Sequence, residues 1–269
     1  MKKIILATLL FLFPAVLSAC GSQDTYRVGA SPVPHADILR EAQELIDEEF
    51  QFEIVEFSDY VLPNTALHEG DIVANFFQHI PYLELQIDEH GYDFESVGGV
   101  HIEPIGLYSK VHDSLETLPE SLEIIISNSP SDRPRLLGVL EDANLIEIKE
   151  ETTDADITNA SLNGLNDLFE SDKDITFKEV SPQQLFSNYD NESGDLVLIN
   201  GNFALDHGLE PLNDALALES TDSPYVNVLV VRSEDVDDPF IQALYEILSS
   251  EEIADWIEEE YKGSVILAN

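Results

Sequence analysis

The amino-acid sequence predicts an α/β protein in which helices cover both faces of a β-sheet. Short apolar segments alternate along the chain with longer segments whose apolar residues repeat at helical spacing. Alternation of strand and helix is typical of α/β folds. Hydrophobic residues occupy 43% of the 269 positions, so the chain is able to build a packed core without relying on disulfides.

The first strand is expected at Tyr26–Ala30, and a turn follows at Ser31 and the two prolines beyond it. A helix is expected over His35–Glu49, because apolar residues recur there every three to four positions. Phe52–Phe57 then predicts a second strand.

Proline and glycine delimit the next two helices. A short helix is expected at Pro63–Glu69, and Gly70 ends it. Ile72–Phe76 predicts a third strand, after which Pro81 begins a helix that stops at Gly91.

The rest of the chain continues the alternation. Later strands are expected at Glu123–Ser127, Thr176–Val180, Leu196–Ile199 and Val226–Val231. The acidic segment Glu141–Asp174 predicts surface helix and loop, and Phe240–Leu248 predicts an amphipathic helix. Ser249 and Glu252 then fit a capping box for a last helix that carries Ile253, Trp256 and Ile257.

The N-terminus has the features of a lipoprotein signal peptide at residues 1–19. Two lysines precede about 13 nearly apolar residues, which is too short for an ordinary membrane-spanning helix. The run ends in Leu17, Ser18, Ala19 and Cys20, which match a bacterial lipobox. Cleavage before Cys20 and attachment of diacylglycerol would tether the protein to a membrane. The alternative is a buried N-terminal helix with a chance cysteine.

The chain is strongly acidic, with a formal charge of −42. Removal of the two lysines of the expected signal peptide would lower this charge to −44. Such a field repels nucleic acids and anionic lipid headgroups. Because the acids are spread along the chain, we interpret them as a solvated surface adapted to high salt or high pH; a cationic partner is the alternative.

Seven segments, in order, resemble one protein family. They are VGASPVPHADIL from Val28, EIVEFSDYVLPNTAL from Glu53, ANFFQHIPYLE from Ala74, VHIEPIGLYSK from Val100, LINGNFAL from Leu198, SPYVNVLVVR from Ser223 and YKGSVI from Tyr261. From about Tyr26 to Ile266 the chain is similar to the NlpA-type methionine-binding lipoproteins, the substrate-capture subunits of methionine ABC importers. The resemblance implies methionine as ligand, the importer's permease and ATPase as partners, and a lipid-anchored location outside the cytoplasm.

The resemblance also implies a two-lobed α/β architecture, the type II periplasmic-binding-protein fold with two hinge strands. The chain would cross between lobes near Ile105–Ser109 and near Tyr225–Leu229. Lobe one would then comprise residues 24–106 and 227–269, and lobe two residues 107–226. Lobes of this kind close around ligand by hinge motion.

Four pocket residues follow from the resemblance: Tyr60, Phe77, His79 and Tyr82. All four come just after expected strands, where the clefts of α/β sheets lie. Aromatic rings attract a thioether sulfur by about 0.3–1.5 kcal/mol per contact. Taken singly, Phe77 and Tyr82 would be interpreted as core residues and His79 as a structural histidine, but the matched segment around them favours a pocket.

Carboxylate recognition is expected from Arg135, because a guanidinium binds a carboxylate through two N–H groups. This residue aligns with the family's arginine after the turn at 126–130. Pro134 replaces the small residue usual in the family, and Arg133 lies one step earlier. Proline is compatible with a first helical turn. A shift of register would nevertheless make Arg133 the ligand-binding cation, and a surface arginine that offsets local acids is the remaining alternative.

Asparagines are expected to hold the polar groups of the ligand. Asn227 aligns with a family asparagine on the second crossing strand, where an amide donates and accepts at once. Asn200 is a second candidate. Asn202 is a weaker one, because it could instead cap the following helix.

Metal-dependent and enzymatic functions have little support in the sequence. The seven histidines, namely His35, His68, His79, His90, His101, His112 and His207, lack metal-ligand spacing, although a zinc site could still assemble in space. Signatures of hydrolases, phosphate-binding loops and dinucleotide-binding folds are not found. We therefore expect neither an enzyme nor a cofactor. A methionine-containing dipeptide, another apolar amino acid, or a surface role without transport remain alternatives.

Overall fold

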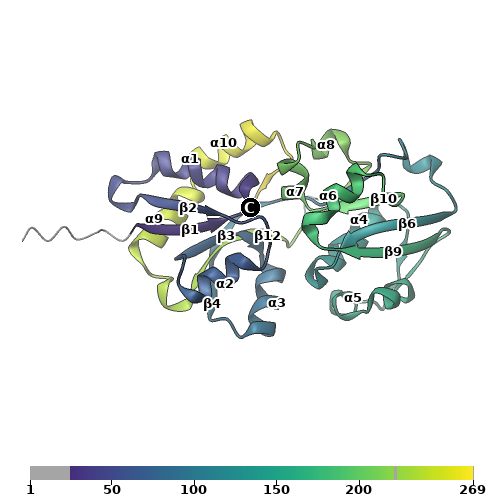
Figure 1. The fold of residues 1–269 in the computed structure, drawn as a ribbon, viewed down its shortest axis with the longest axis horizontal. Coiled ribbons are helices and arrows are strands. Elements are labelled where there is room, and N and C mark those ends of the chain that lie inside the picture. The colour runs from purple at the N-terminus through teal and green to yellow at the C-terminus, as the bar shows by residue number, and fades with distance from the viewer. Residues whose placement is uncertain (1–24, 221–222, 269) are drawn as a thin grey trace, which may run out of the picture.

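The computed structural model describes residues 25–220 and 223–268, and its strands form two principal sheets, each with its own helices (Figure 1). The expected signal peptide and Cys20 lie outside the described residues. No helix within the described part of the chain is long and apolar enough to cross a membrane.

The first sheet has six strands in the order β13-β4-β12-β3-β1-β2. Their bounds are Tyr26–Ala30 (β1), Phe52–Glu56 (β2), Ala74–His79 (β3), Phe94–Ile102 (β4), Val226–Arg232 (β12) and Ile266–Leu267 (β13). The β1 strand runs parallel to β2 and β3, whereas β12 is antiparallel to both β3 and β4. Five helices accompany this sheet: Asp37–Leu45 (α1), Leu62–Glu69 (α2), Ile80–His90 (α3), Pro239–Leu248 (α9) and Glu251–Tyr261 (α10).

Strand β12 shows why helices cover both faces of the first sheet. Leu229 and Val231 pack into the core beneath α1, α9 and α10, while Val228 and Val230 pack into the core beneath α2 and α3. Alternate residues of a strand point to opposite faces, so a strand that is apolar at every position must be covered twice.

The second sheet repeats this plan in the order β11-β5-β10-β6-β9. Its strands are Gly106–Tyr108 (β5), Ser121–Ser127 (β6), Asp174–Val180 (β9), Leu196–Ile199 (β10) and Ala217–Leu218 (β11). The accompanying helices are Arg133–Asp142 (α4), Asp154–Asn159 (α5), Pro182–Asp190 (α6), Gly201–Asp206 (α7) and Pro211–Asp214 (α8), and Glu147–Ile148 (β7) pairs with Phe169–Glu170 (β8). The acidic segment around α5 is thus short helix, loop and one antiparallel pair of two-residue strands.

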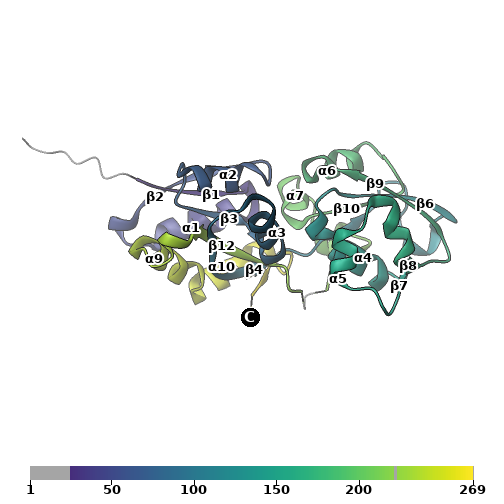
Figure 2. The same ribbon diagram turned by 90° about the horizontal axis from the view of Figure 1, so that it is seen from below.

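The chain passes between the sheets twice. It leaves the first sheet after Ile102 and enters the second at Gly106; it leaves the second after Leu218 and returns at Val226. Both crossings come a few residues earlier than expected. Figures 1 and 2 show the two α/β lobes side by side, with β4 and β12 leading to the junction. The fold is therefore the expected two-lobed one.

Three local expectations were wrong. The first helix spans Asp37–Leu45 and not His35–Glu49, because three consecutive acids follow its end, where the helix dipole disfavours negative charge. The long strand β4 was missed because Gly98 and Gly99 interrupt its apolar pattern. Gly98 is needed there, since a Cβ atom would lie 2.0 Å from the Tyr245 hydroxyl.

The third error concerns the last helix. Its N-cap is Ser250, whose Oγ accepts the N–H of Ile253 at 3.3 Å. Ser249 instead donates its hydroxyl to the Tyr245 carbonyl at the end of α9. The expected capping box was therefore one residue out of register.

The packing of the C-terminal helices against the first lobe can be tested by replacing one buried and one exposed leucine with alanine. Leu244 of α9 is fully buried, whereas Leu212 of α8 is 55% exposed. Leu244→Ala is expected to lower the free energy of unfolding by about 2–5 kcal/mol, because it leaves a cavity in the core. Leu212→Ala is expected to change it by less than about 0.5 kcal/mol. Denaturant unfolding measures both, and equal losses would contradict the packing of α9.

Candidate functional site

A cleft lies where the two lobes meet. It is lined by Tyr60, Phe77, Gln78, His79, Tyr82, Glu103, Ser129, Asp132, Arg135, Asn200, Gly201, Asn202 and Asn227. Most of these residues follow the carboxyl ends of strands β2, β3, β6 and β10, whose parallel neighbours direct their loops to the same edge. All seven residues expected to bind ligand line this one cleft.

Three aromatic rings form the apolar part of the cleft. The centroids of Tyr60, Phe77 and Tyr82 are 6.1 Å apart in each of the three pairs. Polar tips fix the two tyrosines, because Tyr82 donates its hydroxyl to the Tyr60 carbonyl at 2.9 Å and Tyr60 donates to Asn202 Oδ1 at 2.6 Å. Three rings at this spacing leave an apolar surface suited to a flexible, polarisable side chain.

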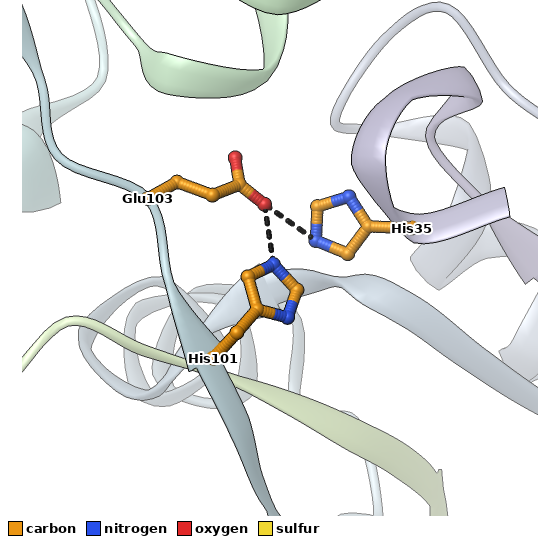
Figure 3. Close-up of side chains that lie close together, drawn as sticks. All are labelled: His35, His101 and Glu103. Carbon is orange, nitrogen blue, oxygen red and sulfur yellow. Dashed lines mark hydrogen bonds and ion pairs between the residues drawn. The ribbon is translucent and has the colours of Figure 1, made fainter. Parts of the chain in front are cut away.

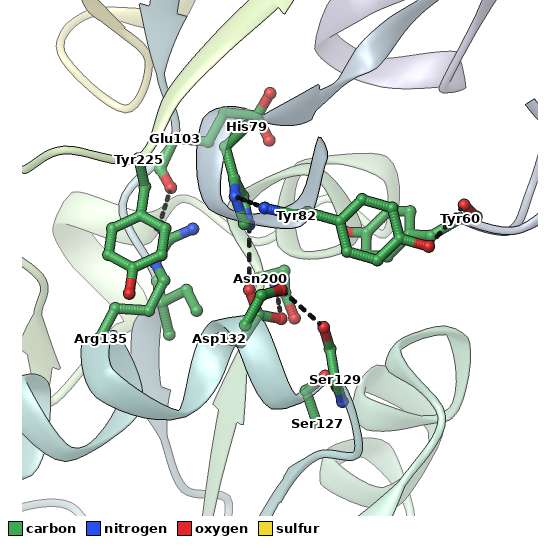
Figure 4. A network of polar contacts seen from close by, with 12 residues as sticks. Tyr60, His79, Tyr82, Glu103, Ser127, Ser129, Asp132, Arg135, Asn200 and Tyr225 are labelled. Carbon is green, nitrogen blue, oxygen red and sulfur yellow. Dashed lines mark hydrogen bonds and ion pairs between the residues drawn. The ribbon is translucent and has the colours of Figure 1, made fainter. Parts of the chain in front are cut away.

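His79 links the first lobe to the second. Its Nδ1 atom accepts the N–H of Tyr82 at the start of α3, so the proton resides on Nε2, which donates to Asp132 Oδ1 at 3.1 Å (Figure 4). Asn200 donates its amide to the other Asp132 oxygen at 3.1 Å. Burial alone would raise the pKa of Asp132, but these donors together hold its pKa below the ordinary value. Asp132 is thus a buried anion that bridges the lobes.

The two candidate arginines lie in different surroundings. Arg135 lines the cleft, donates from Nη2 to the Glu103 carbonyl at 2.7 Å, and pairs with Glu219 through Nε and Nη2. Arg133 is not among the residues of the cleft. It pairs with Glu179 at 2.8 Å and donates to the carbonyls of Thr158 and Ala160. As expected, Pro134 occupies the first turn of α4.

One guanidinium nitrogen of Arg135 makes no hydrogen bond to the rest of the described chain. Its Nε and Nη2 atoms serve Glu219 and Glu103, whereas Nη1 has no protein partner among the described residues. The ring of Tyr225 lies 4.5 Å from the guanidinium carbon and covers one face. Although burial would lower it, pairing with Glu219 raises the pKa of Arg135. If Arg135 bound a carboxylate through two nitrogens, as expected, Nη2 would have to be shared between that carboxylate and its present partners, Glu103 and Glu219.

The asparagines have distinct orientations. The Oδ1 atom of Asn227 lies 3.1 Å from His35 Nε2, which leaves the Asn227 amide N–H groups for another acceptor. Asn200 is the residue before α7, but its side chain does not cap that helix, and its buried Oδ1 has no partner within residues 25–220 and 223–268. Asn202 lies inside α7 and not at its cap, so the alternative of a helix cap does not hold. Its Oδ1 accepts from Tyr60 instead.

Glu103 lines the cleft and contacts two histidines, His35 and His101, that are not among the lining residues (Figure 3). Its Oε1 atom is 3.1 Å from His35 Nε2 and 2.7 Å from His101 Nε2, and all three side chains are buried. Gly201 permits this approach, because a Cβ atom there would lie 2.9 Å from Glu103 Cβ. Burial lowers the pKa of His35 to about 4 and that of His101 to about 3, and it raises the pKa of Glu103.

The same three residues have ligand atoms within 4.8 Å of one another, as a metal site requires. Histidines bound to metal through Nε2 normally donate their Nδ1–H to a second acceptor. Here both Nδ1 atoms are buried without a hydrogen-bond partner in the described part of the chain. The arrangement therefore fits two neutral histidines better than a zinc site: His101 donates its Nε2–H to Glu103, and His35 shares its Nε2–H between Glu103 and Asn227 Oδ1.

Glu103, Asp132 and Glu219 were not identified from the sequence. Their signal was weak, because single acids are common in a chain with 54 of them. The position of Glu103 directly after a strand that crosses toward the second lobe was the one usable indication, and the missed strand β4 concealed it.

Two α/β lobes, joined by two crossings around a cleft with an aromatic and a charged end, define a solute-binding protein of the periplasmic type. Comparison with known proteins agrees. The NlpA lipoprotein family matches residues 26–269, and the chain belongs to this family.

Relatives span essentially the whole chain. The methionine-binding lipoprotein MetQ of Bacillus subtilis is 39% identical over 99% of this chain and 98% of its own length. A lipoprotein of the YaeC family from Enterococcus faecalis has a structure with a TM-score of 0.84 at 43% identity, covering 91% of this chain and all of that one. A nutrient-binding protein of Burkholderia cenocepacia, solved with methionine bound, has a TM-score of 0.82 at 34% identity over 91% and 100%.

The buried histidines predict a pH dependence of stability. Because burial depresses the pKa values of His35 and His101 from 6.5 to about 4 and 3, the unfolded chain binds more protons than the native state below about pH 6.5. The free energy of unfolding therefore decreases as the pH is lowered below this value. From neutral pH to about pH 4.5, the wild-type protein is expected to lose about 1–3 kcal/mol more than His101→Gln.

Denaturant unfolding across this pH range measures the difference. The raised pKa of Glu103 acts in the opposite direction, but both proteins carry that residue. His68→Gln, which changes an exposed histidine, is the matched control and should follow the wild type. A His101→Gln curve parallel to the wild type would contradict a neutral buried His101.

Proposed function

We propose that this protein captures methionine in the cleft between its lobes and delivers it to an ABC importer. The observation that carries the proposal is the joint presence, in one cleft, of the Arg135 guanidinium and a cage of three aromatic rings. A cation and an apolar cage together suit an amino acid with a soft apolar side chain. The names of its relatives support methionine as that amino acid.

In this proposal, the ligand carboxylate binds Arg135 and Asn227. Arg135 Nη1 is free of protein partners among the described residues, and the Asn227 amide has its N–H groups turned away from His35. Glu219 holds the guanidinium in place, so little side-chain freedom is lost on binding. The clamp is pre-organised, which favours affinity.

The thioether would lie among Tyr60, Phe77 and Tyr82, with His79 at the edge of the cage. His79 contributes an edge-on ring 6.3 Å from Tyr82 and a fixed tautomer through its bond to Asp132. Asn200 and Asn202 complete the polar wall from the second lobe. We assign these groups a binding and not a catalytic role. Ser129, the serine of the cleft, contacts the Ser131 hydroxyl at 3.1 Å and, among the described residues, no base.

The remaining assignments extend from the family. A diacylglycerol anchor at Cys20, after removal of residues 1–19, would hold the protein on the outer side of the cell membrane. Permease and ATPase subunits would receive the methionine. Residues 24–106 with 227–269, and residues 107–226, would move as the two lobes, since each range carries one sheet and its helices apart from Gly106 of β5 and Val226 of β12.

A ligand-stabilisation scan tests the proposal. The soluble chain from residue 21 is unfolded in denaturant, dialysed to remove carried ligand and refolded. Melting is then followed with L-methionine, D-methionine, glycyl-methionine and the other common amino acids. Methionine at 100 times its dissociation constant is expected to add about 2.7 kcal/mol of stability, which is a shift of a few degrees. Folded protein that responds to no amino acid would contradict the proposal.

Replacement of the two arginines distinguishes the clamp. Arg135→Ala is expected to weaken methionine binding by at least about tenfold, because a desolvated carboxylate loses its partner at a cost of about 2–5 kcal/mol. Arg133→Ala removes a neighbouring buried ion pair outside the cleft, so it should lower stability and leave affinity unchanged. Isothermal titration calorimetry measures both. The reverse pattern would make Arg133 the clamp.

A further inference from the structure

The cleft contains more buried acid than the single arginine balances. Glu103, Asp132 and Glu219 are all in or beside it, and Arg135 is the one arginine among its lining residues. Glu219 pairs with Arg135, and Asp132 accepts hydrogen bonds from His79 and Asn200. Glu103 differs from these two in what surrounds its carboxylate.

The carboxylate of Glu103 receives only neutral donors. Its Oε1 atom faces the Nε2 atoms of His35 and His101, and the backbone N–H of Asn202 at the start of α7 also points toward the carboxylate. Both histidines are neutral where burial keeps their pKa values near 4 and 3. Within the described residues, no side-chain cation touches this buried carboxylate, although Glu103 lines the cleft and is 6% exposed.

Glu103 and Arg135 are also neighbours, since Arg135 Nη2 donates to the Glu103 backbone carbonyl at 2.7 Å. A positive and a negative group are thereby placed side by side at one end of the cleft. The α-carboxylate and α-ammonium of a free amino acid are a pair of opposite charges on one carbon atom. Such a zwitterion would supply Glu103 with the counter-charge that it lacks and would give Arg135 a second carboxylate partner beside Glu219.

We infer that Glu103 is the acceptor for the α-ammonium group of the ligand, and that His35 and His101 are positioning residues that hold its carboxylate toward the cleft. This inference rests on the proposed function and narrows it. The ligand must carry a free ammonium beside a free carboxylate. Glycyl-methionine, whose methionine nitrogen is an amide, lacks that ammonium and is excluded as a good ligand.

The first test changes the ligand and leaves the protein intact. Calorimetry compares L-methionine with 4-(methylthio)butanoate, which lacks only the ammonium, and with glycyl-methionine. Methionine is expected to bind at least about thirtyfold more tightly than either, since removing one partner of a buried charge pair has an effect of this size or more. Equal affinity of methionine and 4-(methylthio)butanoate would overturn the inference.

The second test replaces the carboxylate. Glu103→Gln preserves shape, and the amide oxygen is still able to accept from both histidines, which leaves an NH₂ group toward the ligand. Methionine binding should weaken at least about thirtyfold, whereas 4-(methylthio)butanoate binding should change less than about threefold. Glu179→Gln, which alters a half-buried acid paired with Arg133 outside the cleft, is the matched control and should change neither affinity.

The positioning role of the histidines has its own readout. His101→Gln retains an N–H donor near Glu103, whereas His101→Leu does not. The ratio of methionine to 4-(methylthio)butanoate affinity should stay near the wild-type value in the first variant and fall at least about fivefold in the second. A merely structural role would lower both affinities together and leave the ratio unchanged, which would overturn this part of the inference.

The outcomes separate this inference from the proposed function. Wild-type protein that binds no methionine fails the proposed function itself. A second outcome is that the wild-type protein binds methionine, but Glu103→Gln loses affinity equally for methionine and 4-(methylthio)butanoate. This outcome would support the proposed function and refute Glu103 as the ammonium acceptor. If Glu103→Gln does not fold, the ligand series on the wild-type protein still decides the question.

Discussion

A guanidinium group that is removed from water requires a counter-charge, and this requirement organises the junction between the lobes. Arg135 on α4 pairs with Glu219 at the start of the second crossing and donates to the Glu103 carbonyl in the first. Ile105 of the first crossing donates its N–H to the same Glu219 carboxylate at 3.0 Å. Loss of one partner of such a buried pair costs about 3–5 kcal/mol. Both crossings are therefore tied to one helix, and the cation that faces the cleft is fixed before any ligand arrives.

Contacts between the lobes depend on this junction. Tyr60 donates to Asn202, and His79 donates to Asp132, in each case from the first lobe to the second. Tyr60 belongs to the loop after β2 and His79 is the last residue of β3, whereas the acceptors belong to the segments after β6 and β10. A ligand stabilises this closed arrangement only to the extent that it binds it more tightly than an open one. A zwitterion that touches both crossings and the aromatic cage meets that condition.

Prediction from sequence succeeded where the signal was local. Gly70 and Gly91 end their helices in the left-handed conformation, with φ of 80° and 69°, as their positions after apolar runs indicated. Prediction from sequence failed where the local structure or the role of a residue depends on a contact with a residue far away in the chain. The two glycines of β4 interrupt the apolar pattern of the strand. Gly98 is nevertheless required within it, because the side chain of Tyr245, almost 150 positions later in the sequence, packs against its backbone. Likewise, the choice between Arg133 and Arg135 depends on Glu179 and Glu219, which no local pattern identifies.

Sequence by itself determined the α/β class, most strands and helices, and, through ordered family segments, seven of the thirteen residues that line the cleft. Hydrophobic periodicity and turn residues are properties of neighbouring positions in the chain, so the sequence alone is enough to identify them. Only the tertiary structure decided which acids matter among 54, because the role of a carboxylate depends on what surrounds it when water is excluded. Glu103 became significant once the fold placed two neutral histidines and a cleft around it, since charge is balanced in space and not along the chain.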